Sequence, residues 1–276
     1  MLLLFADGNP HILDLRSKKG YFLCISLHFM GFPETADIET SSSGYAARFS
    51  GAAGEWMLSV QRRGVLSLLG ECAGRRVLEP GGGHAQLAPA MLSAGAEVTV
   101  LASSAQCAQR LAALSGSAGF KFEVGNLISF PYPDKSFDAV ISVRFLSHCA
   151  RWQEFVAETC RVARDCVIVD YPPLASFNFL TGSLFALKKR LEGNTRRYAV
   201  FSDKEIVNAF AANGYQPERC IRQFFFPMVL HRILGCPVIS EILEKLAACL
   251  GLRALFGSPV LVKMVRKETA SAHKSI

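Results

Sequence analysis

This chain of 276 residues lacks several features that would point directly to a function. Its nine cysteines form no Cys-x-x-Cys pair, and no histidine lies near them at the spacing of a metal site. Lysine and arginine (30) outnumber the acidic residues (23), but the basic residues never form a run of five or six. These absences predict neither a metal site nor nucleic-acid binding. The net charge of +7 indicates only a mild preference for anionic partners.

The sequence also lacks an apolar run long enough to cross a bilayer. The most apolar N-terminal stretch, "GYFLCISLHFMGF" (20–32), is too short to span one, and no small-residue cleavage site follows it. With unpaired cysteines, this predicts a cytoplasmic protein without a transmembrane segment. Residues 1–29 show no clear period and precede Met30. Residues 1–40 are therefore expected to form an extension that need not be ordered, and translation from Met30 is an open alternative for its first part.

After this extension, strand and helix patterns alternate. Short β-branched strands separated by helical segments are typical of a parallel sheet with right-handed crossovers. The prediction is a doubly wound, mostly parallel α/β domain over residues 41–276, with its core at 65–172 and insertions at 173–202 and 227–252. The expected strands are 75–80, 97–102, 120–125, 137–143, 166–171 and 259–267, and the expected helices are 54–70, 84–94, 104–115, 151–162 and one capped by Ser202.

A glycine turn, "VLEPGGGHAQLAP" (77–89), follows the first strand of this domain. In such sheets ligands bind at the carboxyl ends of the strands, and glycine lets the backbone approach them closely. A dinucleotide fingerprint counted from Gly81 requires glycine at position 86, where the chain has Gln86. The spacing therefore argues against a nicotinamide or flavin dinucleotide.

The pattern that fits is acid-x-Gly-x-Gly-x-small, formed by Glu79, Gly81, Gly83 and Ala85. At the right separation follows "VGNLISFPYPDKSFDAVISVRFLSHCARWQEFVAETCRVAR" (124–164). Together these segments resemble the class I S-adenosylmethionine-dependent methyltransferases, of the small-molecule, quinone-biosynthesis-like type. The resemblance covers roughly residues 65–172, and it implies a Rossmann-like methyltransferase fold with S-adenosylmethionine as the cofactor.

The resemblance also implies site residues and shows two departures. His148 aligns with the family's histidine after the fourth strand. Two roles are open for it, a general base or a helix-capping residue. Ala102 stands where the family has an acid for the ribose hydroxyls, and Asn126 stands where it has an aspartate near the adenine. Ala102→Asp is therefore expected to tighten cofactor binding, and Gly81→Val to abolish it while the fold survives. The implied cofactor residues are Glu79, Gly81, Gly82, Gly83, Ala102, Ser103, Gly125, Asn126, Leu127, Val143 and Arg144.

Acceptor specificity must come from outside the sheet. Small-molecule methyltransferases of this class often place a helical lid before the first strand, which here is residues 41–63. The expected acceptor residues are Tyr45, Arg48 and Trp56 in this lid, and Arg196 and Arg197 in the insertion at 173–202. The apolar segment 224–252 is open to three interpretations: a substrate wall, a dimer face or a membrane-surface contact. The oligomeric state is left open.

The predicted function is methyl transfer to a small or lipid-like acceptor, anionic in character and methylated at oxygen. A sulfonium already carries an activated methyl group, so the protein needs to align the acceptor and supply a base for a hydroxyl. The alternative is a catalytically silent scaffold that retains the cofactor fold, for which Ala102 is the main argument.

Overall fold

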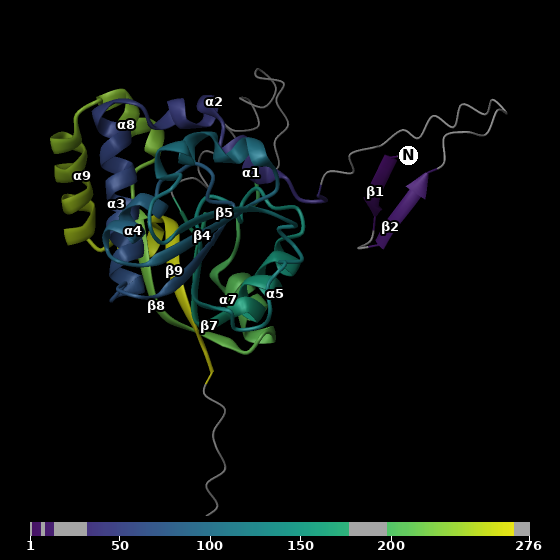
Figure 1. Cartoon of the computed structure of the whole chain (residues 1–276). Coiled ribbons are helices and arrows are strands. Elements are labelled where there is room, and N and C mark those ends of the chain that lie inside the picture. The colour runs from purple at the N-terminus through teal and green to yellow at the C-terminus, as the bar shows by residue number, and fades with distance from the viewer. Residues whose placement is uncertain (1, 7–8, 14–31, 177–197, 268–276) are drawn as a thin grey trace, which may run out of the picture. The chain divides into compact units, whose positions relative to one another are not determined.

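The computed structural model describes residues 2–6, 9–13, 32–176 and 198–267 (Figure 1). The chain divides into two compact units, Met1–Met30 and Gly31–Ile276. In the first unit, β1 (Leu2–Ala6) pairs with β2 (Asn9–Leu13) as an antiparallel hairpin, where the sequence showed no clear period. The second unit begins ten residues ahead of the boundary expected from the sequence, and residues 34–41 pack within it.

The second unit is built on a seven-stranded sheet of order β5-β4-β3-β6-β7-β9-β8. β3 to β7 run parallel, and β9 pairs antiparallel with both β7 and β8. The chain runs from β3 outward to β5 and then returns to β6 on the other side of β3, so the topological switch point lies between β3 and β6. The strands are β3 (Arg76–Pro80), β4 (Glu97–Ala102), β5 (Phe120–Val124), β6 (Phe137–Ser142), β7 (Ala163–Tyr171), β8 (Tyr215–Phe224) and β9 (Ser258–Arg266).

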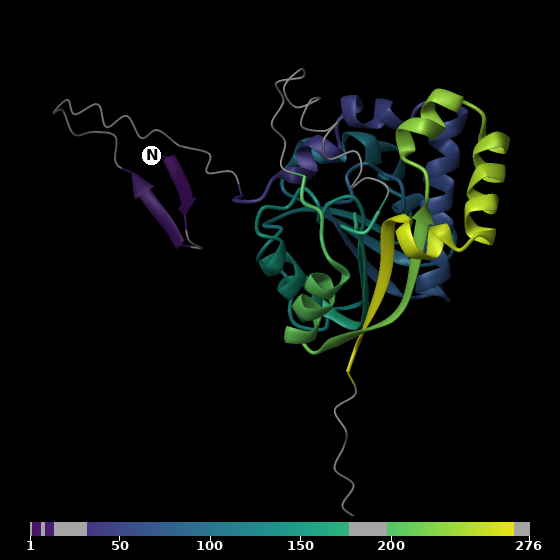
Figure 2. The ribbon, with the colours of Figure 1, turned by 180° about the vertical axis from the view of Figure 1, so that it is seen from behind.

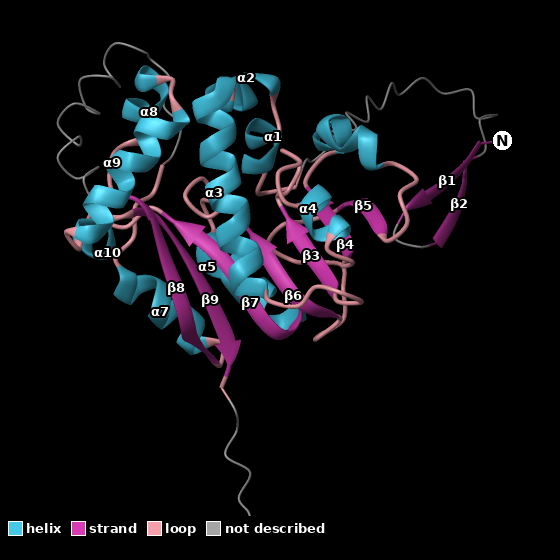
Figure 3. Ribbon diagram, turned by 90° about the vertical axis from the view of Figure 1, so that its left-hand side faces the viewer, coloured by secondary structure: helices cyan, strands magenta, loops and turns pink. Residues whose placement is uncertain are grey.

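Helices cover both faces of the sheet, which confirms the predicted doubly wound α/β fold (Figures 1, 2 and 3). The long helix α3 (Gly51–Leu69) packs on one face with α4 (Ala88–Ser93) and the 3-10 helix η2 (Ala105–Leu114). On the opposite face lie α5 (Trp152–Val162) and α7 (Asp203–Ala212). Each face therefore has its own apolar cluster, with the fully buried central strands contributing to both.

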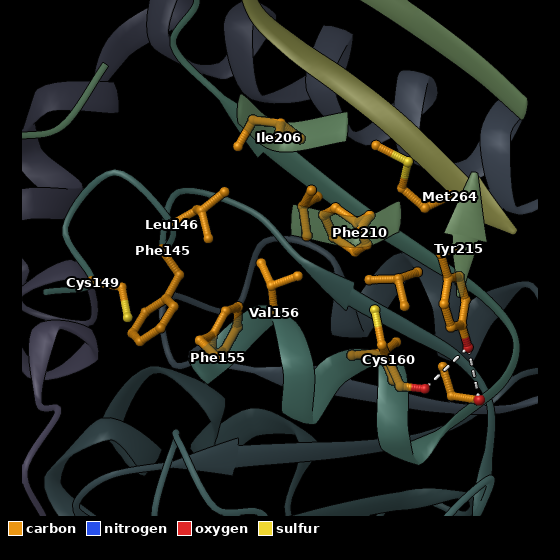
Figure 4. Packing of buried hydrophobic residues seen from close by; sticks show 14 of the residues in the cluster. Phe145, Leu146, Cys149, Phe155, Val156, Cys160, Ile206, Phe210, Tyr215 and Met264 are labelled. Atoms are coloured by element: carbon orange, nitrogen blue, oxygen red, sulfur yellow. Dashed lines mark hydrogen bonds between the residues drawn. The ribbon is translucent and has the colours of Figure 1, made fainter. Parts of the chain in front are cut away.

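The cluster under α5 and α7 is shown in Figure 4. Phe155 from α5 and Phe210 from α7 are fully buried there. The single proton of the Tyr215 hydroxyl is shared between the carbonyls of Cys160 and Ala163, at 3.2 and 2.9 Å, so its buried polar end is satisfied. Ser202 caps α7 as predicted, and a reciprocal bond from Glu205 completes a capping box.

The loop after β3 is longer than the sequence pattern predicted. The expected helix at 84–94 begins only at Ala88, because Ala85 adopts a left-handed φ of 60° and its N–H bonds to the Gly82 carbonyl at 3.1 Å. Pro89 therefore lies in the first turn of α4, where its missing N–H removes no helical hydrogen bond. The loop residues His84 and Gln86 are left free to contribute side chains to the site.

Three short helices lie between β8 and β9: α8 (Met228–Leu234), α9 (Pro237–Cys249) and α10 (Leu252–Phe256). Buried Glu244 on α9 accepts hydrogen bonds from the backbone N–H groups of Phe225 and Phe226 and contacts the His231 ring, which fixes the insertion to the end of β8. No helix within the described ranges is long and apolar enough to span a membrane. Exposed apolar side chains nevertheless cover the outer surface of this insertion, including Val229, Ile233, Val238, Ile242, Leu246, Leu250 and Leu255.

Candidate cofactor and acceptor site

The glycine turn lies at the carboxyl end of β3, beside the switch point. Gly81 adopts a left-handed φ of 76°, and its N–H donates to the Leu101 carbonyl at 2.8 Å, which ties the ends of β3 and β4 together. A Cβ at Gly81 would lie 2.8 Å from Cδ2 of Phe145, and one at Gly83 would lie 2.2 Å from Oγ of Ser41. This chain's own packing therefore requires glycine at both positions.

Glu79 lies beneath the turn. Its side chain occupies the space a Cβ on Gly82 would need, with Cδ only 2.4 Å from that position. The residue is buried, and neither carboxylate oxygen has a hydrogen-bond partner among the described residues. Burial raises the pKa of Glu79 to about 8, and the nearby backbone N–H of Ala88 opposes this only in part. An unpaired carboxylate beside a glycine turn fits a cationic group such as the α-ammonium of S-adenosylmethionine.

Residues 34–41, which include α1 (Ala36–Thr40), form a strap across the carboxyl edge of the sheet. At one end, Glu34 Oε2 accepts from the backbone N–H of Ala150, just before α5, at 2.7 Å. At the other, Asp37 Oδ2 accepts from the backbone N–H of Ser103, just after β4, at 2.7 Å. Both carboxylates are buried. The strap is therefore anchored on both sides of β3, next to the glycine turn.

Two buried thiols support these anchors. Cys149 Sγ lies 3.4 Å from Glu34 Oε2, and Cys107 Sγ lies 3.4 Å from Asp37 Oδ2. Burial, followed by the charge of Asp37, raises the pKa of Cys107 to about 12, so this thiol stays protonated and donates to the carboxylate. Cys107 therefore acts as a packing and hydrogen-bonding residue, not a nucleophile.

The adenine side of the predicted site is formed at the ends of β4 and β5. The N–H of Gly125 donates to the Ala102 carbonyl at 2.9 Å, and Asn126 Oδ1 accepts from the N–H of Ile128 at 3.0 Å. Ala102 is completely buried and ends β4, so the strand itself offers no acid. The side chains of Leu127 and Val143 are buried in the two apolar clusters, so these residues can face the crevice only through their backbone.

A polar network joins four segments on the methionine side. Arg144 has a left-handed φ of 61°, and its N–H donates to Asp170 Oδ1 at 2.6 Å. Asp170 Oδ2 accepts from the Gln61 side chain at 2.9 Å, and Gln61 in turn accepts from Gln86 at 2.9 Å. Burial raises the pKa of Asp170 to about 6 against the opposing effect of Arg144. The network links α3, the glycine turn and the ends of β6 and β7.

His148 lies in the turn after β6 and is half-buried. Its ring makes edge contacts with Tyr45 on α2 (Ser43–Ala46) and with Tyr198, at centroid distances of 6.4 and 5.6 Å. The N-cap of α5 is Arg151, so His148 does not hold that position. Arg48 lies over the Tyr45 ring at 5.3 Å. Three residues expected near the acceptor, His148, Tyr45 and Arg48, are thus brought together.

Trp56, another residue expected near the acceptor, does not join this cluster. Trp56 packs against Phe224 and His231, at centroid distances of 5.4 and 5.1 Å, which corrects the expectation that it faces the ligand. Its helical register turns it toward β8 and α8 rather than toward the glycine turn. Arg196 and Arg197 lie outside the described residues. Among the residues described, no cluster of His, Cys, Asp and Glu could hold a metal ion.

A cavity of about 690 Å³ lies between the lid helices and the loop after β3. Its lining includes Arg62, Arg110 and Arg144 together with His84. Burial and the nearby Arg144 lower the pKa of His84 to about 3, so its ring is neutral. Arg62, His84 and Arg110 could not be predicted from the sequence, because their spacing along the chain resembles that of ordinary surface and loop residues. Glu55 offsets part of the charge at 3.6 Å from Arg62, and the cavity remains basic.

The comparisons with known proteins agree with this geometry. Residues 78–167 match the model of a family described as "Methyltransferase domain". This range begins within β3, contains the glycine turn and ends within β7. Residues 78–167 therefore form a methyltransferase domain.

Relatives of the methyltransferase domain share its fold across most of the chain. A S-adenosylmethionine-dependent methyltransferase of Thermotoga maritima is 16% identical with a TM-score of 0.61, covering 84% of this chain and 99% of that one. Magnesium protoporphyrin IX methyltransferase of Synechocystis, solved with bound SAH, is 16% identical with a TM-score of 0.55, covering 83% and 96%. Ajmaline N-methyltransferase of Rauvolfia serpentina is 40% identical over 57 residues, and the match spans 20% of each chain.

Proposed function

We propose that this chain transfers the methyl group of S-adenosylmethionine to a hydroxyl oxygen of a small or lipid-like, anionic acceptor. The observation that carries the proposal is the position of His148, which lies with Tyr45 and Tyr198 just after β6 and within four residues of Arg144. An imidazole ring at the carboxyl edge of the sheet can accept the proton of a hydroxyl acceptor. Cytoplasmic location is part of the proposal, because the cysteines in the described ranges are all free.

The residues of the crevice have distinct roles in the proposal. Glu79 would hold the α-ammonium group of the cofactor beside the glycine turn, and Asn126 would border the adenine. When bound there, S-adenosylmethionine supplies a methyl group already activated on a sulfonium. The buried network around Asp170 keeps the backbone of Arg144 in its left-handed conformation, which fixes the turn leading to His148.

His148 provides the base. A ring nitrogen would accept the proton of the acceptor hydroxyl, and the imidazolium would then release that proton to solvent. The transfer would form the O–CH3 bond and break the S–CH3 bond of the sulfonium, leaving S-adenosylhomocysteine. The edge contacts of Tyr45 and Tyr198 hold the ring in position, so little orientation has to be gained in the transition state. Aromatic walls of this kind suit an acceptor with an apolar or planar body.

Two surfaces support the assigned acceptor class. Arg62, Arg110 and Arg144 around the neighbouring cavity favour a carboxylate or phosphate group. The exposed apolar side chains on α8 to α10 support a lipid-like acceptor, since a protein reaches an acceptor dissolved in a bilayer most easily through an apolar surface. These two features together favour an amphipathic acceptor with an anionic end.

The test combines an acceptor screen with His148→Gln. Purified full-length chain and labelled S-adenosylmethionine are incubated with water-soluble and detergent-extracted metabolite pools, and labelled products are separated. We expect a labelled product from an anionic hydroxyl compound, and a fall in kcat of about 10²- to 10⁴-fold in His148→Gln with unchanged cofactor affinity. The variant should also lose the acidic limb of the pH profile of kcat.

Three results would contradict this proposal. A product methylated at nitrogen, carbon or sulfur would refute the oxygen acceptor. Unchanged kcat and pH profile in His148→Gln would remove the base. Binding of S-adenosylhomocysteine without any labelled product from either pool would favour the silent scaffold instead.

A further inference from the structure

The end of β4 is where an adenosyl ligand on this type of sheet meets protein through its ribose. In open α/β sheets the nucleoside lies across the carboxyl ends of the strands, and an acid following the second strand of the unit accepts from the ribose hydroxyls. β4 is that strand here, and it ends at Ala102, whose side chain is fully buried and cannot accept a hydrogen bond. The strand alone therefore leaves the ribose without its usual partner.

A carboxylate is nevertheless present at this strand end, and it comes from the strap. Asp37 accepts from both the backbone N–H and the hydroxyl of Ser103, at 2.7 and 2.5 Å. Ser103 is the residue that immediately follows Ala102, and Asp37 is completely buried against it. The side chain of Asp37 thus stands beside the position that an acid at residue 102 would occupy.

We propose that Asp37 is the ribose-binding acid of this methyltransferase, supplied by the N-terminal strap in place of the missing acid on β4. The proposal rests on the proposed function, since it concerns the same cofactor. Two carboxylate oxygens offer about four acceptor positions, and the described contacts of Asp37 come from the Ser103 N–H, the Ser103 hydroxyl and the Cys107 thiol. The Ser103 hydroxyl and the thiol are rotatable donors, so each can release its position to a ribose hydroxyl.

The strap's second anchor makes this assignment specific. Glu34 holds the other end of the strap on the backbone N–H groups of Ala150 and Arg151, at 2.7 and 3.4 Å. Ser41, at the C-terminal end of α1, packs on Gly83 of the glycine turn. The position of Asp37 is therefore fixed on both sides, which is what a bidentate acceptor for two neighbouring hydroxyls requires.

The proposal changes what is expected of position 102. From the sequence alone, Ala102→Asp was expected to tighten cofactor binding. With Asp37 already at the strand end, a second buried carboxylate would lie beside the first, and like charges at such a site disfavour each other. Ala102→Asp should therefore weaken binding in the wild-type background and restore it only when Asp37 is removed.

The experiment is calorimetric titration of the full chain with S-adenosylhomocysteine and with an analogue that lacks both ribose hydroxyls. Wild type should bind the parent compound about tenfold more tightly than the analogue. Asp37→Asn should lose about tenfold for the parent compound and little for the analogue. Asp37→Asn with Ala102→Asp should recover most of the loss. Asp134→Asn removes an exposed acid paired with Arg161 at the opposite edge and should bind as wild type.

Each alternative gives a different pattern. Equal or tighter binding of S-adenosylhomocysteine by Asp37→Asn would mean that the strap covers the site instead of completing it. An equal loss for both ligands, with no rescue at position 102, would leave Asp37 as a strap anchor only. If wild type binds neither ligand, the proposed function fails together with this inference. Thermal melting of each variant shows whether a loss of binding follows from a loss of fold.

Discussion

The raised pKa of Glu79 predicts how the stability of the ligand-free chain depends on pH. Its pKa of about 8, against 4.5 for an ordinary glutamate, means that the folded chain holds a proton that the unfolded chain has lost between these two pH values. Stability therefore falls as pH rises through this range, by up to about 1.4 kcal/mol per pH unit. Glu79→Gln cannot ionise and should remove this contribution.

Two other buried groups determine which pH window isolates Glu79. The pKa of His84 is lowered from 6.5 to about 3. Between these pH values the unfolded chain binds a proton at His84 that the folded chain does not, so stability rises with pH up to 6.5. The pKa of Asp170 is raised from 3.8 to about 6, and its effect is complete above that pH. Between pH 6.5 and 8, Glu79 is the group of these three that still titrates. Wild type should lose about 2 kcal/mol across this window.

The assay is urea unfolding of the full chain, followed by circular dichroism at half-unit steps from pH 6.5 to 8. Glu79→Gln should give a nearly flat free energy of unfolding and exceed wild type by about 3 kcal/mol at pH 7. Asp138→Asn is the matched control, since Asp138 is a buried acid bonded to the Arg76 N–H at 2.8 Å and to Arg164 at 2.7 Å. It should be less stable at every pH but keep the wild-type slope. A slope in Glu79→Gln equal to that of wild type would refute the assignment.

The remaining predictions concern the strap and the glycine turn. A chain that begins at Met30 should fold and bind cofactor as the full chain does, whereas one that begins at Ser42 removes both Glu34 and Asp37 and should lose binding in a calorimetric titration; equal binding by both would contradict the role of the strap. Gly81→Val should lower the stability by about 2 kcal/mol or more, because its Cβ would lie 2.8 Å from Phe145 at a φ of 76°. An unchanged melting temperature for this variant would restore the original expectation that only binding is lost.

The sequence predicted the parallel strands and β9 because their signals are local, whereas β8 was not among the expected strands. The strand at 97–102 and the capped helix after Ser202 were found at their observed positions, since β-branched runs and capping residues act within a few positions of themselves. The position of the glycine turn could also be predicted, because Gly81 directly follows a strand. The late start of α4 was missed, since the left-handed conformation of Ala85 depends on tertiary packing and not on a glycine signal.

The acids that anchor the strap could not be predicted in the same way. Asp37 bonds to Ser103 across 66 positions, and Glu34 bonds to Ala150 across 116. In the local sequence "ETADIET" both residues read as the polar side of a surface helix. Nothing in periodicity distinguishes an exposed acid from one buried against a backbone N–H. The same limit applies to the contact between Gln61 and Asp170, which spans 109 positions.

Independently of residue spacing, the charges at the carboxyl edge favour a sulfonium cofactor over a dinucleotide. A dinucleotide places its pyrophosphate over the glycine turn and the following helix N-terminus, so this site must stabilise negative charge. Here the carboxylate of Glu79 lies directly under that turn, without a hydrogen-bond partner within the described ranges, and Asp37 lies at the end of the neighbouring strand. A pyrophosphate would force Glu79 to remain protonated, whereas an α-ammonium group would lower the pKa of Glu79 and be stabilised by the carboxylate charge. The electrostatics of the turn and the presence of Gln86 in place of the last fingerprint glycine thus favour the same cofactor class, although the chain as a whole carries a net charge of +7.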